Sequence, residues 1–134
     1  MAQETAEVST VERLLGVCKR PPAEQLLTFN SWRDDKGKPV AFHVRALTYN
    51  EVEEINEMNR GNSGKIAAAI ICKGVIAPDL RDERLQQALG VATPYEVVTK
   101  MLRAGEIVDL QIAIEKLSGY RHSTISVVAD IEKN

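Results

Sequence analysis

Residues 93–120 read TPYEVVTKMLRAGEIVDLQIAIEKLSGY, and this stretch predicts two consecutive helices. Thr93 and Glu96 have the spacing of a capping box, in which each side chain hydrogen-bonds the backbone N–H of the other residue. Pro94 suits the first helical position, where its missing N–H costs nothing. The first helix therefore begins at Thr93. Its apolar side recurs at helical spacing in Val97, Val98, Met101 and Leu102.

The sequence Ala104-Gly105-Glu106 predicts a sharp joint between the two helices. Glycine is a poor helix former, and the Glu106 carboxylate is favourable at the positive end of a new helix. We expect Gly119 to end that second helix in a left-handed conformation. Its apolar face consists of Ile107, Leu110, Ile114 and Leu117. None of these side chains is chemically reactive, so the stretch predicts a packing unit and not a catalytic one.

The composition favours one soluble, helix-rich domain over residues 1–134. The net charge is −2 and no basic stripe is present, so we expect no nucleic-acid partner. No apolar run approaches the roughly 18 residues that span a bilayer, and the N-terminus lacks the features of a signal peptide. We therefore expect a cytoplasmic protein without a membrane partner, in which Cys18 and Cys72 are reduced thiols.

Residues 25–33 and 39–47 carry the one clear β signal, and the turn-rich segment 34–38 between them predicts a hairpin. Leu27 and Phe29 of the first strand are expected on the buried face. In the second strand one face is predicted to hold Val40, Phe42, Val44 and Ala46, and the other Ala41, His43, Arg45 and Leu47. A lone hairpin is marginal in water, so helices must cover one side.

Helices are predicted before and after this hairpin. Residues 1–8 are expected to be frayed, and a short helix over 9–17 to begin at Ser9. After the second strand, Thr48 and Glu51 form another capping box and begin a helix over 49–60.

The segment 65–75, KIAAAIICKGV, is apolar on nearly all sides and is therefore expected to be buried. Its length and alanines favour a helix, whereas its isoleucines leave a strand open. Asp82 is expected to cap a helix that Gly90 closes, and the last fifteen residues to add a strand or a short helix. The predicted fold is α+β in two layers, with two or three antiparallel strands packed against four to six helices.

We find no local pattern for catalysis, a cofactor or a metal. His43 and His122 have no Cys or His neighbour at metal-ligand spacing. Residues 60–66, RGNSGKI, imitate a phosphate-binding loop, but two residues stand between the glycines where four are needed. The acidic run 51–57 is interpreted as a solvated helix face. The expectation is a protein that is not an enzyme.

Three aromatic residues are the candidates for partner binding, namely Trp32, Tyr49 and Tyr120. Trp32 lies beside the hairpin turn. It either anchors a partner, as tryptophan does in many binding hot spots, or shields the end of the hairpin.

The order of these features resembles the XkdN-like tail assembly chaperone family of tailed phages and prophages, over about residues 24–134. The matching pieces are Phe42-x-x-Arg45-Ala46-Leu47-Thr48, Val75-Ile76-Ala77-Pro78-Asp79-Leu80, Leu85 to Gly90, Met101-Leu102-x-x-Gly105-Glu106 with Leu110 and Ile114, Ser118-Gly119-Tyr120, and Glu132-Lys133-Asn134. One departure is Ala104, where the family is expected to carry proline.

The resemblance implies a non-enzymatic protein that binds the tape measure protein, keeps it soluble while tail tube protein polymerises around it, and is absent from the mature virion. Many copies on one tape, as a homo-oligomer, would act through avidity. It also implies a longer, frameshifted form. Glu132-Lys133-Asn134 is compatible with the slippery codons GAA-AAA-AAC, which reading the gene would test. The alternative interpretation is a small acidic adaptor or antitoxin-like regulator.

Overall fold

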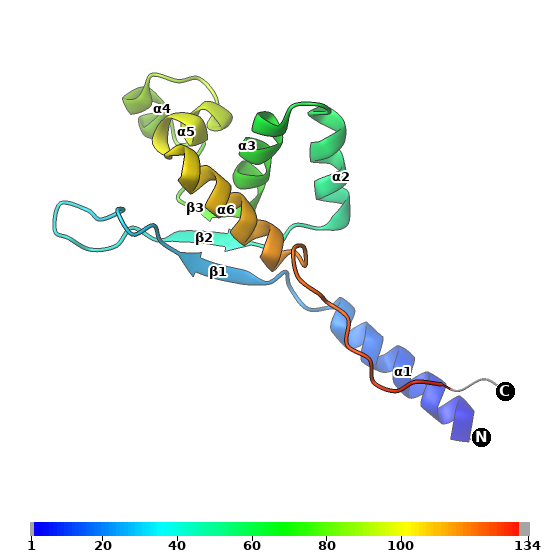
Figure 1. The fold of residues 1–134 in the computed structure, drawn as a ribbon. Helices are drawn as coiled ribbons and strands as arrows, with labels where there is room; N and C mark the ends of the chain where they lie inside the picture. The colour runs from blue at the N-terminus through cyan, green and yellow to red at the C-terminus, as the bar shows by residue number, and fades with distance from the viewer. Residues whose placement is uncertain (1, 132–134) are drawn as a thin grey trace.

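The computed structural model describes the backbone of residues 2–131 and the side chains of residues 9–131 (Figure 1). In chain order the elements are α1 (Ala2–Cys18), β1 (Glu24–Leu27), β2 (Phe42–Arg45), α2 (Tyr49–Met58), α3 (Ser63–Gly74), β3 (Val75–Ala77), α4 (Glu83–Leu89), α5 (Pro94–Met101) and α6 (Ala104–Leu117). The predicted α+β class is confirmed.

The three strands form one antiparallel sheet in the order β1-β2-β3. Helices α2–α6 lie on one side of this sheet in Figure 1, and α6 crosses directly over β2. Helix α3 is central, since it packs against α2, α5 and α6. The arrangement buries a single aliphatic core, built mainly from Phe42, Val44, Ile55, Ile70, Ile71, Val97, Val98, Leu102, Leu110 and Ile114.

The hairpin is shorter than the sequence predicts. Phe42 and Val44 are buried, as their alternation indicates, but ladder pairing stops at Leu27 and Phe42. Beyond this pair the Thr28 side chain donates to the carbonyl of Val40 at 2.8 Å, and backbone pairing returns only at an isolated bridge between Arg33 and Pro39. Leu47, predicted on the opposite face, is also buried, because the strand ends before it and the alternation no longer applies.

The segment 65–75 adopts both of the structures that its composition allows. It is helical as far as Gly74, and Val75 then begins the third strand. That strand does not come from the last fifteen residues, for which a strand or short helix was expected. Residues 121–131 form neither, because they pair with no strand and complete no helical turn, and residues 132–134 lie outside the described part of the chain.

The predicted helix caps are largely present. The Thr48 hydroxyl accepts from the Glu51 N–H, and the Glu51 carboxylate accepts from the Thr48 N–H, which completes the capping box. Thr93 accepts from the Glu96 N–H in the same way. The Glu96 carboxylate does not reach back to the backbone, because it accepts from the Thr93 hydroxyl instead.

The joint between the last two helices lies before Gly105, and not at it. Leu102 and Arg103 have extended backbones, so Gly105 falls within the first turn of α6. At the other end of α6, Gly119 has a φ of 96°, as predicted. The N–H of Tyr120 donates to the carbonyl of Glu115, which closes the helix as a Schellman motif.

Helix α1 begins seven residues earlier than the sequence predicts. The structure continues it back to Ala2, so Ser9 lies within the helix and is not its cap. Residues 2–8, expected to be frayed, are its first turns, and Met1 lies outside the described residues. Figure 1 shows α1 projecting away from the sheet and the other helices.

Candidate partner-binding surface

Glu106 joins the hairpin loop to the start of α6. One oxygen of its carboxylate accepts from the Arg103 N–H at 2.8 Å and caps the helix. The other oxygen accepts from the Trp32 indole N–H at 3.1 Å and from the Ser31 hydroxyl at 3.3 Å. This carboxylate therefore fixes a loop and a helix that are about seventy residues apart in sequence.

Trp32 is held from two sides. Its ring packs against Phe29 and Phe42 at centroid distances of 5.8 and 5.4 Å, and its indole N–H is occupied by Glu106. This geometry favours the role of shielding the end of the hairpin over that of an anchor that awaits a partner.

Arg45 and Glu51 form a half-buried ion pair between β2 and α2. Two guanidinium nitrogens of Arg45 donate to the two carboxylate oxygens at 2.9 and 2.7 Å. The hydrogen bonds from Arg45 lower the pKa of Glu51 from 4.5 to about 2, against the opposing effect of burial. The same carboxylate also caps α2, so it connects the end of β2 to the start of this helix.

We expect acid to weaken the ion pair between Glu51 and Arg45. Because the pKa of Glu51 is lower in the folded state, its contribution to the free energy of unfolding is complete above its unfolded pKa of 4.5. It is lost as the pH falls toward about 2. Between about pH 6 and about pH 3, the wild type should lose about 1–2 kcal/mol more than Glu51→Gln. Urea unfolding at both pH values measures this, and equal losses would contradict it.

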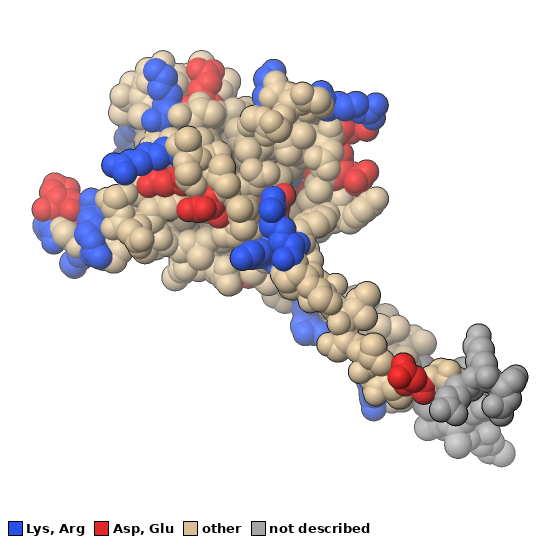
Figure 2. All heavy atoms as spheres, viewed as in Figure 1, with Lys and Arg blue, Asp and Glu red and all other residues tan. Residues whose placement is uncertain are grey.

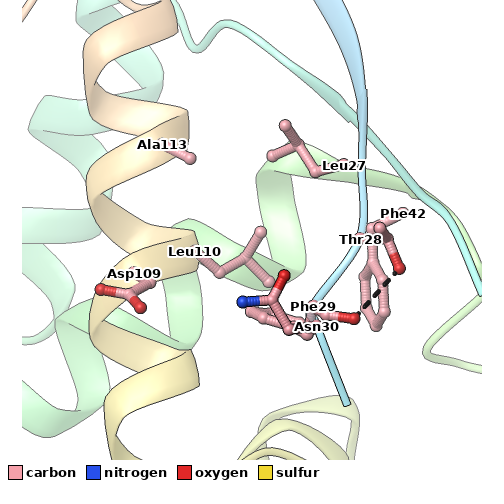
Figure 3. A pocket seen from close by; sticks show the side chains of 8 residues that line it. All are labelled: Leu27, Thr28, Phe29, Asn30, Phe42, Asp109, Leu110 and Ala113. Carbon is pink, nitrogen blue, oxygen red and sulfur yellow. Dashed lines mark hydrogen bonds between the residues drawn. The ribbon is translucent and has the colours of Figure 1, made fainter. Parts of the chain in front are cut away.

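Three hollows lie between the described elements. The smallest, about 260 Å³, separates the end of β1 from α6 (Figure 3). In Figure 3 Leu110 and Ala113 of α6 lie on one side of it and Leu27 of β1 on the other. Its polar side chains are those of Thr28, Asn30 and Asp109, and the Thr28 hydroxyl donates to the carbonyl of Val40.

The second hollow brings together two of the three predicted partner-binding residues. Tyr49 and Tyr120 both line it, although they are 71 positions apart in sequence. Its volume is about 350 Å³ and its apolar walls are Leu47, Val52, Ile66, Ile70 and Ile114. We call it the tyrosine hollow. Trp32 is not among its lining residues, so the structure does not unite the three aromatic candidates.

The largest hollow is a groove of about 720 Å³ bounded by α2, α3 and α5, which we call the α2–α5 groove. Its floor consists of small or aliphatic side chains, namely Ile55, Ala68, Ala69 and Cys72. Two large apolar side chains at its edges are exposed to solvent, Met58 by 75% and Tyr95 by 52%. A partner could cover both while approaching the floor closely.

The rim of the α2–α5 groove carries charges of both signs. Glu51 and Glu54 come from α2, Lys65 and Lys73 from α3, Arg81 from the loop after β3, and Glu96 from α5. Elsewhere charges of both signs are interspersed on the face shown in Figure 2. Charges around an apolar floor suit a partner that carries charged residues beside an apolar stripe.

The Cys72 thiol in the floor of the groove is weakly acidic. Burial raises the pKa of the Cys72 thiol to about 11, so little thiolate is present near neutral pH. Within residues 9–131, no three side chains of His, Cys, Asp or Glu gather in a way that could hold a metal ion. Among the helices described, none combines the length and apolar character that a membrane span requires.

The sequence alone did not reveal the α2–α5 groove. Its lining residues come from three helices and the loops between them, and only the folded chain brings these together. One signal was present in KIAAAIICKGV, where three alanines stand in a row. Alanines in an otherwise large-residue apolar helix leave room beside it, which a neighbouring element or a partner must fill.

Comparison with known proteins gives two matches. One solved structure, described as the crystal structure of the protein yqbn, a structural genomics target, has a TM-score of 0.66 and 21% sequence identity. The similarity covers 76% of this chain and 89% of that one, and shows a shared fold. No curated protein sequence gives a match. The model of the phage XkdN-like tail assembly chaperone family matches residues 11–132, and the chain therefore belongs to that family.

Proposed function

We propose that the chain binds the tape measure protein through the α2–α5 groove, keeps it soluble in the host cytoplasm and so assists assembly of the tail tube. Family membership supports a role in tail assembly. The observation that carries the choice of surface is the groove itself, with its small-residue floor between three helices. Family membership also favours this role over that of an adaptor or antitoxin-like regulator.

The occupant that fits this groove is an amphipathic helix. A helix lays its apolar face into a groove through side chains at positions i, i+3, i+4 and i+7. Ala68 and Ala69 allow its backbone to come close to α3, and Met58 and Tyr95 then close over its sides. A long helical tape exposes many such stripes, which would otherwise associate with one another.

Charge at the groove edge should abolish binding without unfolding the chaperone. Met58→Glu and Tyr95→Glu each place a carboxylate beside the apolar floor, at positions exposed enough to tolerate it. We expect at least a tenfold loss of affinity for a tape measure segment, about 1.4 kcal/mol. The matched control is Tyr49→Glu at the tyrosine hollow, where the tyrosine is 71% exposed.

The experiment is co-expression with the tape measure protein, followed by separation of soluble from pelleted material and by titration of the purified partners. Wild type and Tyr49→Glu should keep the tape soluble, whereas the two groove variants should not. If Tyr49→Glu alone loses the tape, the tyrosine hollow is the binding surface and the groove proposal is wrong. A tape that pellets with every variant and with wild type contradicts the function as well.

Tail tube protein and a longer, frameshifted form of the chain are further proposed partners. In this proposal the chaperone leaves before the virion is complete, because tube subunits replace it on the tape. Affinity for each stripe must then be modest, and many copies on one tape supply the total by avidity. Mass spectrometry of purified virions tests this, since the chain should be missing from them.

A further inference from the structure

The tyrosine hollow has the features of a binding site that the proposed function does not use. Its apolar walls include two core residues, Ile70 and Ile114, which are 3% and 0% exposed. The rings of Tyr49 and Tyr120 line the same hollow and remain 71% and 41% exposed. Apolar walls with a few polar groups around them are typical of a site that holds a ligand or a side chain of a partner.

The polar side chains around the tyrosine hollow have few partners of their own. Among residues 9–131, no side-chain hydrogen bond or ion pair is formed by Tyr49, Glu53, Asn56 or Tyr120. The Ser118 hydroxyl, in contrast, is occupied by two backbone groups. The hollow therefore presents two phenol hydroxyls, one carboxylate and one amide that a bound group can use.

The charge of the tyrosine hollow is negative. Its charged lining residues are Glu53 and Glu115, and neither a lysine nor an arginine of residues 9–131 lines it. The Arg121 guanidinium, from outside the lining, donates to the Glu115 carboxylate at 2.7 Å. This pair neutralises Glu115, so Glu53 carries the charge that no ion pair among the described side chains compensates. The α2–α5 groove differs, because charges of both signs surround it. The tyrosine hollow is therefore complementary to a cation.

Arginine is the cationic side chain that suits these walls best. Its aliphatic stem packs on apolar walls while its head group stays at the polar rim. Its planar guanidinium stacks on aromatic faces and donates to carboxylate and hydroxyl oxygens at the same time. The ammonium of lysine is more strongly hydrated, so it loses more on entering an apolar hollow. An acidic side chain would be repelled by Glu53.

We propose that the tyrosine hollow binds an arginine side chain on an exposed segment of a partner protein, with an apolar residue of that segment beside it. Tyr49 and Tyr120 face the guanidinium, and Glu53 accepts from it. The volume of about 350 Å³ is at the lower end for ligand pockets and suits one or two side chains. The site is preformed, since Tyr49 is the first residue of α2 and the N–H of Tyr120 donates to the Glu115 carbonyl. It is distinct from the α2–α5 groove and does not depend on the proposed function.

The first test is an NMR titration of the full chain with acetyl-Leu-Arg-Leu-amide and with its analogues that carry Gln or Glu in place of Arg. The Arg peptide should shift the ring signals of Tyr49 and Tyr120 along a saturable curve. The Gln peptide should bind about fivefold more weakly, and the Glu peptide more weakly still. Equal affinity for the Arg and Gln peptides, the absence of a saturable shift, or shifts confined to Met58 and Tyr95 in the α2–α5 groove overturns the proposal.

Two variants at neighbouring positions locate the bound cation. Glu53→Gln and Glu54→Gln remove the same charge from exposed positions of α2, but Glu53 lines the tyrosine hollow and Glu54 lines the α2–α5 groove. Glu53→Gln should weaken binding of the Arg peptide about fivefold and leave the Gln peptide unchanged, whereas Glu54→Gln should change neither. Equal losses in the two variants would indicate a general effect of net charge and would overturn the site.

Two further probes test the choice of arginine and of a protein segment. Acetyl-Arg-amide should bind about fivefold more weakly than the Arg peptide, because it lacks the leucines that pack on the apolar walls. The corresponding Lys peptide should also bind more weakly than the Arg peptide. Equal affinity for acetyl-Arg-amide overturns the assignment to a protein segment, and a preference for the Lys peptide overturns the choice of arginine. None of these measurements involves the tape measure protein, so their failure and that of the proposed function are distinguishable.

Discussion

Replacing Gly74 with alanine is expected to lower the free energy of unfolding by about 2–3 kcal/mol. Gly74 is buried at the end of α3, where this helix meets α6. A Cβ added there would lie 2.9 Å from both Cδ1 and Cγ2 of Ile114. Ile114 is fully buried and packed, so it cannot turn aside without opening a void elsewhere in the core. The glycine is there for the close approach of two helices, and not as a left-handed helix cap.

The matched control is Gly105→Ala in the first turn of α6. A Cβ at this position meets no atom within 4 Å, so the substitution carries only the gain in helix propensity, up to about 1 kcal/mol. Urea unfolding of both variants should give shifts of opposite sign. Ile114→Val removes one of the clashing methyl groups, so it should cost less in the Gly74→Ala background than alone. Equal effects at the two glycines would contradict this account of Gly74.

Replacing Glu106 with alanine should cost about 2–3 kcal/mol and change the fluorescence of the protein. The substitution removes the acceptor for the Arg103 N–H and for the Trp32 indole N–H together. Hydrogen bonds to a charged acceptor are each worth more than neutral ones, and the Trp32 indole N–H left behind is partly buried. Trp32 is the single tryptophan, so its emission should shift to the red as the indole becomes more hydrated.

Two variants separate the contributions of Glu106. Glu106→Gln keeps an acceptor of the same shape and should recover most of the stability and the wild-type emission maximum. Ser31→Ala removes only the longest of the three hydrogen bonds, at 3.3 Å, and should cost much less. If Glu106→Ala unfolds at the wild-type urea concentration with unchanged emission, the carboxylate does not hold the hairpin loop against α6.

The features that the sequence predicted correctly are local ones. The two residues of the Thr48 capping box are three positions apart, the Gly119 cap lies at the end of one helix, and Phe42 and Val44 alternate within one strand. In each case the signal and the structure lie in the same short window, so residue type and spacing suffice. The composition of the 65–75 segment is compatible with a helix and with a strand, so the sequence left both open. In the structure the segment is helical as far as Gly74, and Val75 begins a strand.

The features that the sequence missed depend on contacts between distant residues. Glu106 was predicted to favour a helix start, which it does, but its bond to Trp32 joins two parts of the chain that only the packing of α6 over the hairpin brings together. The break before α6 was placed at Gly105 because glycine is a poor helix former. The Glu106 carboxylate accepts from the Arg103 N–H, and α6 therefore begins at Ala104. Gly105 then falls in the first turn, where a glycine costs little stability.

The partner-binding residues show the same contrast between local signals and contacts that only the fold creates. Tyr49 and Tyr120 were predicted to bind a partner, and the fold places both at one hollow. The floor of the α2–α5 groove consists of Ile55, Ala68, Ala69 and Cys72, and none of these was predicted to bind a partner. Small side chains mark a binding surface only when the neighbouring helices stand far enough apart to leave it open.

The two cysteines lie on different parts of the molecule, and each reports on its own surroundings. Cys72 lies in the floor of the groove, whereas Cys18 lies on α1. Alkylation at mildly basic pH should modify Cys18 quickly and Cys72 slowly, because the pKa of Cys72 is raised by burial. A helix bound in the α2–α5 groove would shield Cys72 and leave Cys18 reactive. Mass spectrometry of one labelled sample therefore measures the occupancy of the groove, with Cys18 as the internal control and without any engineered tag.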